Sequence, residues 1–227
     1  MKNFVLLSVF FTFQFLCGQN KTAVDSLYVE DQFYISTTYN FFGNKLDNLN
    51  QNGFPFGFHF GFIKDFPLNK KRNIALGLGL GYSTNSFNNN IFINKDANNN
   101  FNYSFIEPGV TFSKNKLSHH LIELPIEFRW RTSTAQSYNF WRIYTGFKLG
   151  YVVGNNSKFT GEPQDVKVNG IASINKFQYG LTLSAGYNTW NVYVYYALNP
   201  VFSNTARIDN NVIEINAIKI GLIFYIL

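Results

Sequence analysis

Acidic and basic side chains alternate with apolar ones in the segment ELPIEFRWR, residues 123–131. Successive side chains of a β-strand point to opposite faces. In an extended chain, Glu123, Glu127, Arg129 and Arg131 therefore share one face, and the other face is aliphatic and aromatic. Two carboxylates on one face could act as general acid and base. We favour ion pairing with Arg129 or Arg142, because unpaired charges are costly to bury.

Other residue types that could do chemistry give weaker signals. His119 and His120 could suggest a metal, but adjacent side chains of a strand point apart, so we expect solvated histidines near a strand end. His59 stands alone among small residues and is expected to be a hydrogen-bonded interior residue. The GLGLGY segment resembles a phosphate loop, yet its glycines recur at every second position, as in a strand. We expect no catalytic, cofactor or metal site.

These residues lie in segments in which apolar residues alternate with glycine, polar or charged residues. Each has one apolar face and one face of glycine, polar or charged residues, and each is close to the roughly 9–11 residues that cross a bilayer as a tilted strand. We predict eight such strands, at residues 33–41, 54–62, 74–82, 118–131, 140–152, 177–187, 190–198 and 213–227.

The connections between these strands alternate in length. Short ones are predicted at 65–72, 132–139 and 188–189, and long ones at 42–53, 84–117, 154–173 and 199–212. The Asn triplets at 88–90 and 98–100 indicate a polar, mobile loop. Short periplasmic turns and long extracellular loops are typical of outer-membrane barrels. The predicted fold is therefore all-β, an eight-stranded antiparallel transmembrane up-and-down barrel, closed because open strand edges are costly in lipid. Both ends of the mature chain would lie in the periplasm.

The interior of an eight-stranded barrel is just wide enough for side chains. We expect an ion-paired plug there, with room provided by the glycines of the second and third strands. Two acids facing four bases require further partners, such as tyrosines, backbone groups or water. The expected members of the plug are Glu123, Glu127, Arg129, Arg131, Arg142 and Lys148.

The last segment, IKIGLIFYIL, allows two registers. A lysine that faces lipid at mid-membrane costs roughly 2–4 kcal/mol. We therefore predict that the even-numbered face, from Ile218 to Ile226, points outward and that Lys219 points into the lumen, within reach of Glu123 or Glu127. Tyr225 and Leu227 favour the opposite face near the terminus, and a β-bulge could reconcile the two.

The start of the chain indicates export. A basic lead precedes an apolar run over residues 4–16, which is typical of a signal peptide and too short for a spanning helix. We predict a signal peptide at 1–18, cleaved after Gly18 and with lipidation of Cys17 disfavoured, and a single barrel domain at 19–227.

Charged residues make up 14% of the chain and aromatic residues 19%, and the net charge is +6. Anionic lipid headgroups are the expected neighbours of an exported basic chain, with no nucleic acid.

A secreted lipocalin-like barrel is the rival fold. It would bury the apolar face around a ligand and turn the charged face to water. Alternation alone cannot decide between the two folds. The aromatic excess, the asymmetry of the connections and the last strand favour the membrane barrel.

The segment IELPIEFRWRTSTAQSYNFWRIYTGFKLGY resembles the PorT/SprT family of outer-membrane proteins, which is associated with type IX secretion and gliding motility in Bacteroidota. The similarity extends through DQFYISTTYNF, GFIKDFPLNKKRNIALGLGLGY and YGLTLSAGYNTWNVYVYY. The resemblance implies a noncatalytic barrel that is needed for export of cargo. Its partners would be outer-membrane lipids and other outer-membrane or periplasmic proteins of a multi-component machine, with no small-molecule substrate.

Two other functions stay open. One is a stand-alone structural or adhesive barrel of the OmpA/OmpX type, or a component of an outer-membrane protein assembly complex. The other is a barrel enzyme, which needs a catalytic set that the sequence does not show. Loss of secretion in a deletion strain would select the barrel that is needed for export. An altered surface adhesion alone would select the adhesive barrel.

Overall fold

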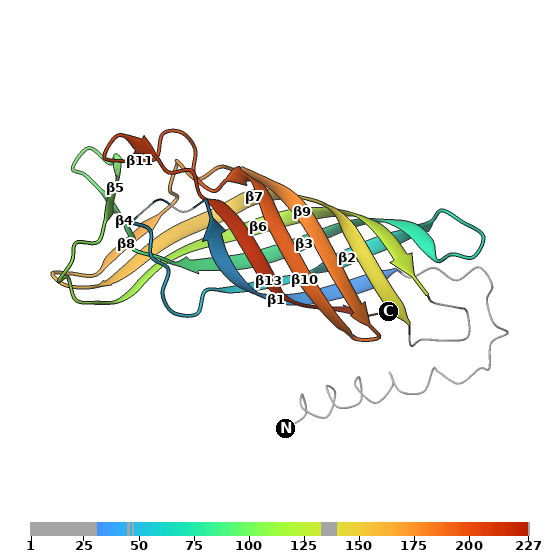
Figure 1. Cartoon of the computed structure of the whole chain (residues 1–227). Helices are drawn as coiled ribbons and strands as arrows, with labels where there is room; N and C mark the ends of the chain where they lie inside the picture. The colour runs from blue at the N-terminus through green and yellow to red at the C-terminus, as the bar shows by residue number, and fades with distance from the viewer. Residues whose placement is uncertain (1–30, 45, 47, 133–139, 227) are drawn as a thin grey trace, which may run out of the picture.

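A computed structural model describes residues 31–44, 46, 48–132 and 140–226. Eight long strands form a closed barrel in this part of the chain (Figure 1). They are β1 (Gln32–Gly43), β2 (Phe56–Pro67), β3 (Ile74–Asn88), β6 (Phe112–Arg131), β7 (Trp141–Gly161), β9 (Phe177–Tyr187), β10 (Trp190–Pro200) and β13 (Asn216–Ile226).

Each barrel strand pairs antiparallel with its neighbours along the chain, and β1 pairs with β13 to close the ring. The predicted up-and-down topology is confirmed. No helix long and apolar enough to cross a membrane occurs among the described residues. The predicted signal peptide, its cleavage site, Cys17, Leu227 and most of the turn predicted at 132–139 lie outside the described residues.

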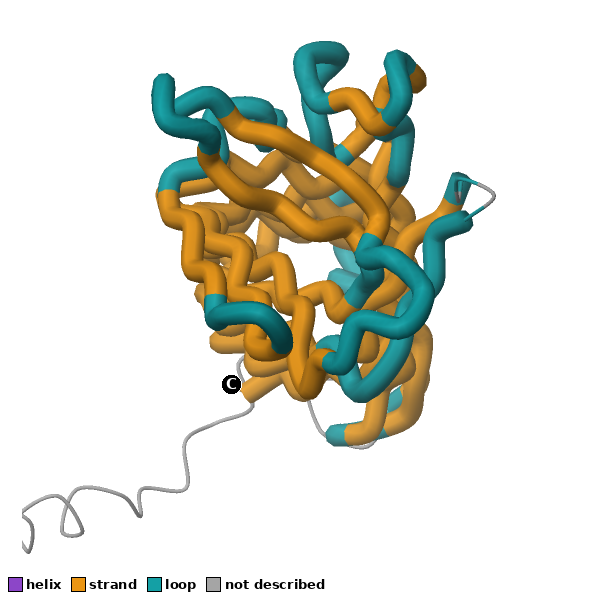
Figure 2. Tube along the Cα trace, turned by 90° about the vertical axis from the view of Figure 1, so that its left-hand side faces the viewer, coloured by secondary structure: helices purple, strands orange, loops and turns teal. Residues whose placement is uncertain are grey.

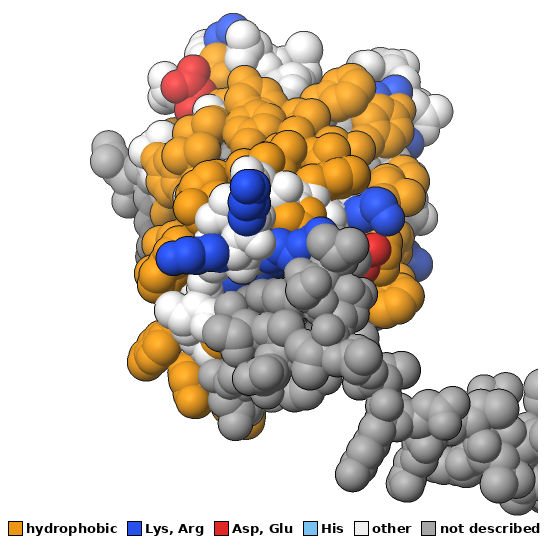
Figure 3. All heavy atoms as spheres, turned by 90° about the vertical axis from the view of Figure 1, so that its right-hand side faces the viewer, with side chains coloured by type: hydrophobic (Ala, Val, Ile, Leu, Met, Phe, Trp, Pro, Cys, Tyr) orange, Lys and Arg blue, Asp and Glu red, His pale blue; other side chains and the backbone are white. Residues whose placement is uncertain are grey.

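The two faces of the strands divide as the alternation predicts. On β9, Leu181 and Leu183 are exposed, whereas Gln178, Thr182 and Ser184 are buried. Figure 3 views one end of the barrel and shows hydrophobic side chains around its sides, with lysine and arginine nearer the middle. The apolar face therefore points outward, which excludes the lipocalin arrangement.

The two ends of the barrel differ. At one end, called here the turn end, residues 68–73 join β2 to β3 and residues 188–189 join β9 to β10. The opposite end, called the loop end, carries all the shorter strands (Figures 1 and 2). These are β4 (Ile91–Lys95), β5 (Phe101–Phe105), β8 (Val166–Asn169), β11 (Arg207–Ile208) and β12 (Asn211–Val212).

The long connection predicted at 84–117 is shorter than expected, and the loop marked by the two Asn triplets contains regular structure. β3 and β6 extend into this range, and β4 and β5 form an antiparallel hairpin between them. Asparagines of the first triplet help to anchor the hairpin, since the Asn89 side chain accepts a bond from the Ile91 N–H at 2.8 Å. The second triplet forms the tip, where the Asp96 carboxylate accepts bonds from the N–H groups of Asn98 and Asn100, each at 2.8 Å.

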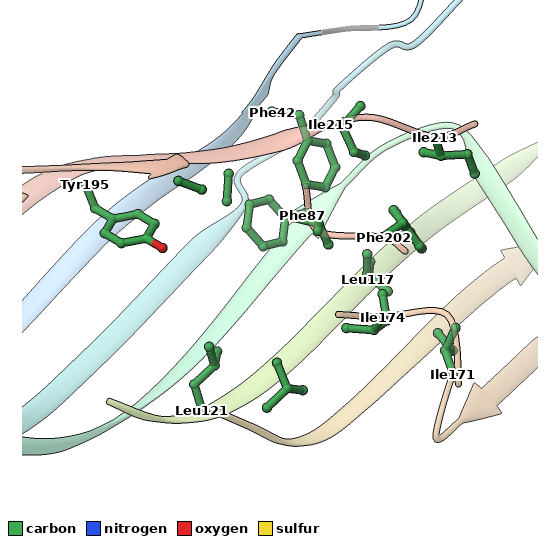
Figure 4. Packing of buried hydrophobic residues seen from close by; sticks show 14 of the residues in the cluster. Phe42, Phe87, Leu117, Leu121, Ile171, Ile174, Tyr195, Phe202, Ile213 and Ile215 are labelled. Atoms are coloured by element: carbon green, nitrogen blue, oxygen red, sulfur yellow. The ribbon is translucent and has the colours of Figure 1, made fainter. Parts of the chain in front are cut away.

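Buried apolar side chains pack together inside the barrel and against the connections at its loop end (Figure 4). The rings of Phe42 and Phe87 stack with centroids 4.5 Å apart. Ile213 and Ile215, which precede β13, are fully buried in the same cluster. Burial of apolar surface is the main stabilising term in folding, so this cluster stabilises the long connections against the barrel.

Candidate functional site: the charged lumen

The structure places all six residues of the predicted plug inside the barrel, on the inward faces of β6 and β7. None exposes more than 5% of its surface. Four lie on β6 because inward residues recur at every second position there, and two lie on β7. The six residues are Glu123, Glu127, Arg129, Arg131, Arg142 and Lys148.

Asp65 organises the charges at the turn end. Its Oδ1 accepts bonds from Arg129 Nη1 at 3.1 Å and Arg131 Nη1 at 2.9 Å, and its Oδ2 accepts one from Arg131 Nη2 at 2.7 Å. Both oxygens are thus engaged by guanidinium groups in the geometry that makes charge-assisted hydrogen bonds strong. The predicted plug does not include Asp65, because the turn predicted at 65–72 begins at this residue, whereas β2 continues to Pro67.

Glu127 adds a second carboxylate to this group. Its Oε2 accepts a bond from Arg129 Nε at 3.1 Å. The guanidinium carbon of Arg129 also lies 4.7 Å from the centroid of the Tyr144 ring. Arg129, not Arg142, is therefore the partner of Glu127.

Glu123 forms a separate group nearer the middle of the barrel. Its carboxylate accepts bonds from Lys148 Nζ at 3.0 Å and Ser83 Oγ at 2.8 Å. His59 Nδ1 lies 3.4 Å from Glu123 Oε2, and His59 Nε2 lies 3.2 Å from Thr38 Oγ1. His59 is thus the hydrogen-bonded interior residue that the sequence predicts.

Lys219 points into the lumen, so the predicted register of the last strand is confirmed. It is 4% exposed, whereas Ile220 is 43% exposed, and β13 pairs with β1 without a bulge over its length. Its Nζ lies 4.8 Å from the centroid of the Tyr195 ring. Among the described residues it forms no ion pair with either glutamate.

The histidine pair behaves differently from the prediction in one respect. His119 and His120 point apart, as expected, and His120 Nδ1 lies 2.7 Å from the Tyr82 hydroxyl. His119 is not solvated but 1% exposed, with its ring centroid 5.7 Å from that of Phe87. The cause is that β6 begins at Phe112, well before the predicted start at residue 118.

The arrangement suits structural pairing better than proton transfer. Both glutamates are engaged by cations in the interior, and the loop end above them is filled by the apolar cluster. Over the described ranges, no three His, Cys, Asp or Glu side chains come together as a metal site requires.

A cavity of about 830 Å³ lies outside the lumen, at the loop end. Its walls come from β4, β5, β8 and the end of β7, and its lining includes Phe92 and Phe159, whose ring centroids are 5.0 Å apart. Lys95, Lys167 and Glu162 stand among its lining residues. Its volume lies within the range of small-molecule pockets, which are lined mainly by apolar side chains with a few polar groups.

Comparison with known proteins identifies the family of this chain. The family described as "Outer membrane protein beta-barrel domain" matches residues 17–203. The chain belongs to that family. It is an outer-membrane β-barrel, as its outward apolar face requires.

The solved structures similar to the outer-membrane barrel include that of Ail, the attachment invasion locus protein of Yersinia pestis. The two chains are 12% identical, the match covers 88% of this chain and 99% of Ail, and the TM-score is 0.35. No curated protein matches the chain.

Proposed function

We propose that this outer-membrane barrel is a noncatalytic accessory component of a type IX protein secretion machine, and that it works through contacts with partner proteins and not as an open pore. The observation that carries the proposal is the filled interior. A charged network occupies the turn end and the middle, and an apolar cluster occupies the loop end. A barrel with a filled interior would function through contacts made by its surface.

The type IX assignment is supported by the resemblance of residues 122–151 to the PorT/SprT family. This segment supplies most of the lumen charges, so the part of the chain that carries the resemblance also fills the barrel. On this proposal the chain is exported by its N-terminal signal peptide in a bacterium of the Bacteroidota. The turn end faces the periplasm and the loop end faces outward, following the usual layout of such barrels.

A second candidate function is that of a stand-alone adhesive barrel. The cavity at the loop end favours it, because that cavity lies among the elements that would face outward. The aromatic and charged side chains that line the cavity could bind part of a molecule on the surface to which the cell adheres. The lumen would then have a structural role alone.

A deletion strain distinguishes the two functions. The proteins in the culture medium and the adhesion of cells to a surface are measured after complementation with the wild type or with a Lys95→Glu, Lys167→Glu double variant, which alters the cavity. A broad loss of secreted proteins that both chains restore supports the accessory barrel. Unchanged secretion, with adhesion restored by the wild type alone, overturns it in favour of the adhesive barrel.

A further inference from the structure

Arg142 is a buried cation, and among the described residues two of its guanidinium nitrogens have no hydrogen-bond acceptor. It is the second residue of β7, it faces the lumen at the turn end, and it is 4% exposed. In the part of the chain that the structure describes, its Nε and Nη1 atoms have no hydrogen-bond partner, and no carboxylate lies within ion-pair distance. Buried polar groups are nearly always hydrogen-bonded, and buried charges almost always paired, so this guanidinium calls for an explanation.

Aromatic rings hold the Arg142 guanidinium in place. Its central carbon lies 4.4 Å from the centroid of the Phe140 ring and 5.6 Å from that of Tyr225. The Tyr225 hydroxyl is itself fixed by Ser184 at 3.1 Å. An arginine held against aromatic faces keeps its N–H groups available for a planar acceptor, and little further freedom is lost when it binds one.

The described charged side chains around Arg142 do not balance. Arg142 lies directly opposite Arg131 in the β6–β7 ladder, and like charges in that position repel. Asp65 binds Arg131 and Arg129, and Glu127 binds Arg129. Among the described lumen residues at this end, three guanidinium groups thus face two carboxylates, and Arg142 carries the excess charge.

The rim of the same end carries exposed lysines, together with the exposed pair of Lys64 and Asp31. Lys70 and Lys71 are exposed on the turn between β2 and β3, and the backbone of that turn contacts the lumen, since the Arg72 carbonyl accepts a bond from Arg131 Nε at 3.0 Å. Figure 3 shows lysine and arginine side chains on this face. A positive rim around a recessed cation attracts small anions and negatively charged segments.

We propose that the turn-end mouth of the lumen is an oxyanion-binding site, in which Arg142 binds a carboxylate or phosphate group. These groups suit a guanidinium because the N–H bonds to them are charge-assisted. Two sources offer this chemistry, free phosphate and the side-chain carboxylate of a peptide. The peptide source rests on the proposed function, whereas binding of an oxyanion as such does not.

The direct test is a titration of the purified full-length barrel in non-ionic detergent, with ¹⁵N-labelled arginine. The Arg142 Nε–Hε signal is assigned by its loss in an Arg142→Lys variant. Sodium phosphate, sodium acetate, acetyl-Gly-Gly-Asp-Gly-Gly amide and the matching Asn peptide are added at constant ionic strength. The expected result is a saturable shift of this signal with oxyanions and none with the Asn peptide.

A thermal measurement provides the variant test. Phosphate is expected to raise the unfolding midpoint of the wild type and to have no such effect on Arg142→Gln. Lys158→Gln removes an exposed positive charge from the other end of β7 and is expected to keep the wild-type response.

Each outcome bears on the proposal. A shift with phosphate and acetate alone supports a site for free ions, and tighter binding of the Asp peptide than of acetate supports a peptide carboxylate. No saturable shift with any oxyanion overturns the site. Equal responses of the wild type and Arg142→Gln also overturn it, and if Arg142→Gln does not fold, the wild-type titration decides alone.

Discussion

Replacement of Asp65 by Asn should destabilise the barrel more than any other single neutralisation of a lumen carboxylate. The change keeps the shape of the side chain and removes its charge. Three charge-assisted bonds from Arg129 and Arg131 converge on this carboxylate, and all three side chains are fully buried. In the variant, an amide group would face two guanidinium groups, and at least one donor would meet another donor.

The expected magnitude follows from these contacts. Breaking a buried ion pair by removing one partner costs about 3–5 kcal/mol, and water in the lumen would lower that figure. Glu127→Gln affects one charge-assisted bond, to Arg129, which is worth about 1.5–3 kcal/mol. Asp31→Asn is the control: it removes the 3.4 Å pair with the exposed Lys64, and such pairs contribute about 0.2–1 kcal/mol. The asparagine oxygen can still accept the 2.8 Å bond that Asp31 Oδ1 receives from the Asp65 N–H.

The assay is reversible urea unfolding of each variant in lipid vesicles, followed by the fluorescence of the tryptophans. All three, Trp130, Trp141 and Trp190, lie on the outward face and leave the lipid on unfolding. The loss in free energy of unfolding should fall in the order Asp65→Asn, Glu127→Gln, Asp31→Asn. A loss for Asp65→Asn no larger than that of Asp31→Asn would refute the view that Asp65 organises the turn end.

Three further results are expected. The purified barrel should show no steady ion conductance in a planar bilayer, because both the charged network and the apolar cluster obstruct the lumen; a stable open level would contradict this. In single-cysteine variants with lipid-phase spin labels, positions 218, 220 and 222 should report lipid and position 219 a shielded interior, since Lys219 faces the lumen. The backbone N–H of Asn100, with that of Asn98, holds the pKa of Asp96 below its usual range. A lowered pKa gives stability that is present above the usual aspartate range and is lost as the pH falls through the lowered value. The amide signal of Asn100 should therefore change on strong acidification, and in Asp96→Asn it should not.

The alternation of apolar and polar residues predicts most of the barrel strands and their inward faces. The free-energy cost of placing Lys219 in lipid selects the register of β13. The strand pattern selects the inward face that carries the plug. Asp65 was missed because Pro67 and the basic residues after it indicate an early turn. The inward positions of β2 nevertheless continue from His59 through Ile63 to Asp65, and that spacing is the signal that could have revealed it.

The loop end could not be predicted in the same way. Its short strands have no long alternation of their own, and they are ordered by packing against distant segments. Phe42 stacks on Phe87, and Ile174 forms a bridge with Phe202. Contacts of this kind depend on the closed barrel, which brings the connections together at one end. A single long connection, considered alone, therefore looked mobile.

Glycine and charge are matched across the lumen wall, and this matching explains how a narrow barrel holds so many long side chains. A Cβ added at Gly77 would lie 2.7 Å from Arg129 Nε and 3.0 Å from Ile63 Cγ2. The interior of an eight-stranded barrel has a fixed width, so each long inward side chain needs a neighbour without one. The strand pairs meet this need at four of the six plug residues: Glu123 lies beside Gly81 and Gly150, Glu127 beside Gly77 and Gly146, Lys148 beside Gly180, and Arg142 beside Gly186. The glycines that resemble a phosphate loop are thus the steric complement of the charges, and a register that moved them by one residue would place side chains where the plug now lies.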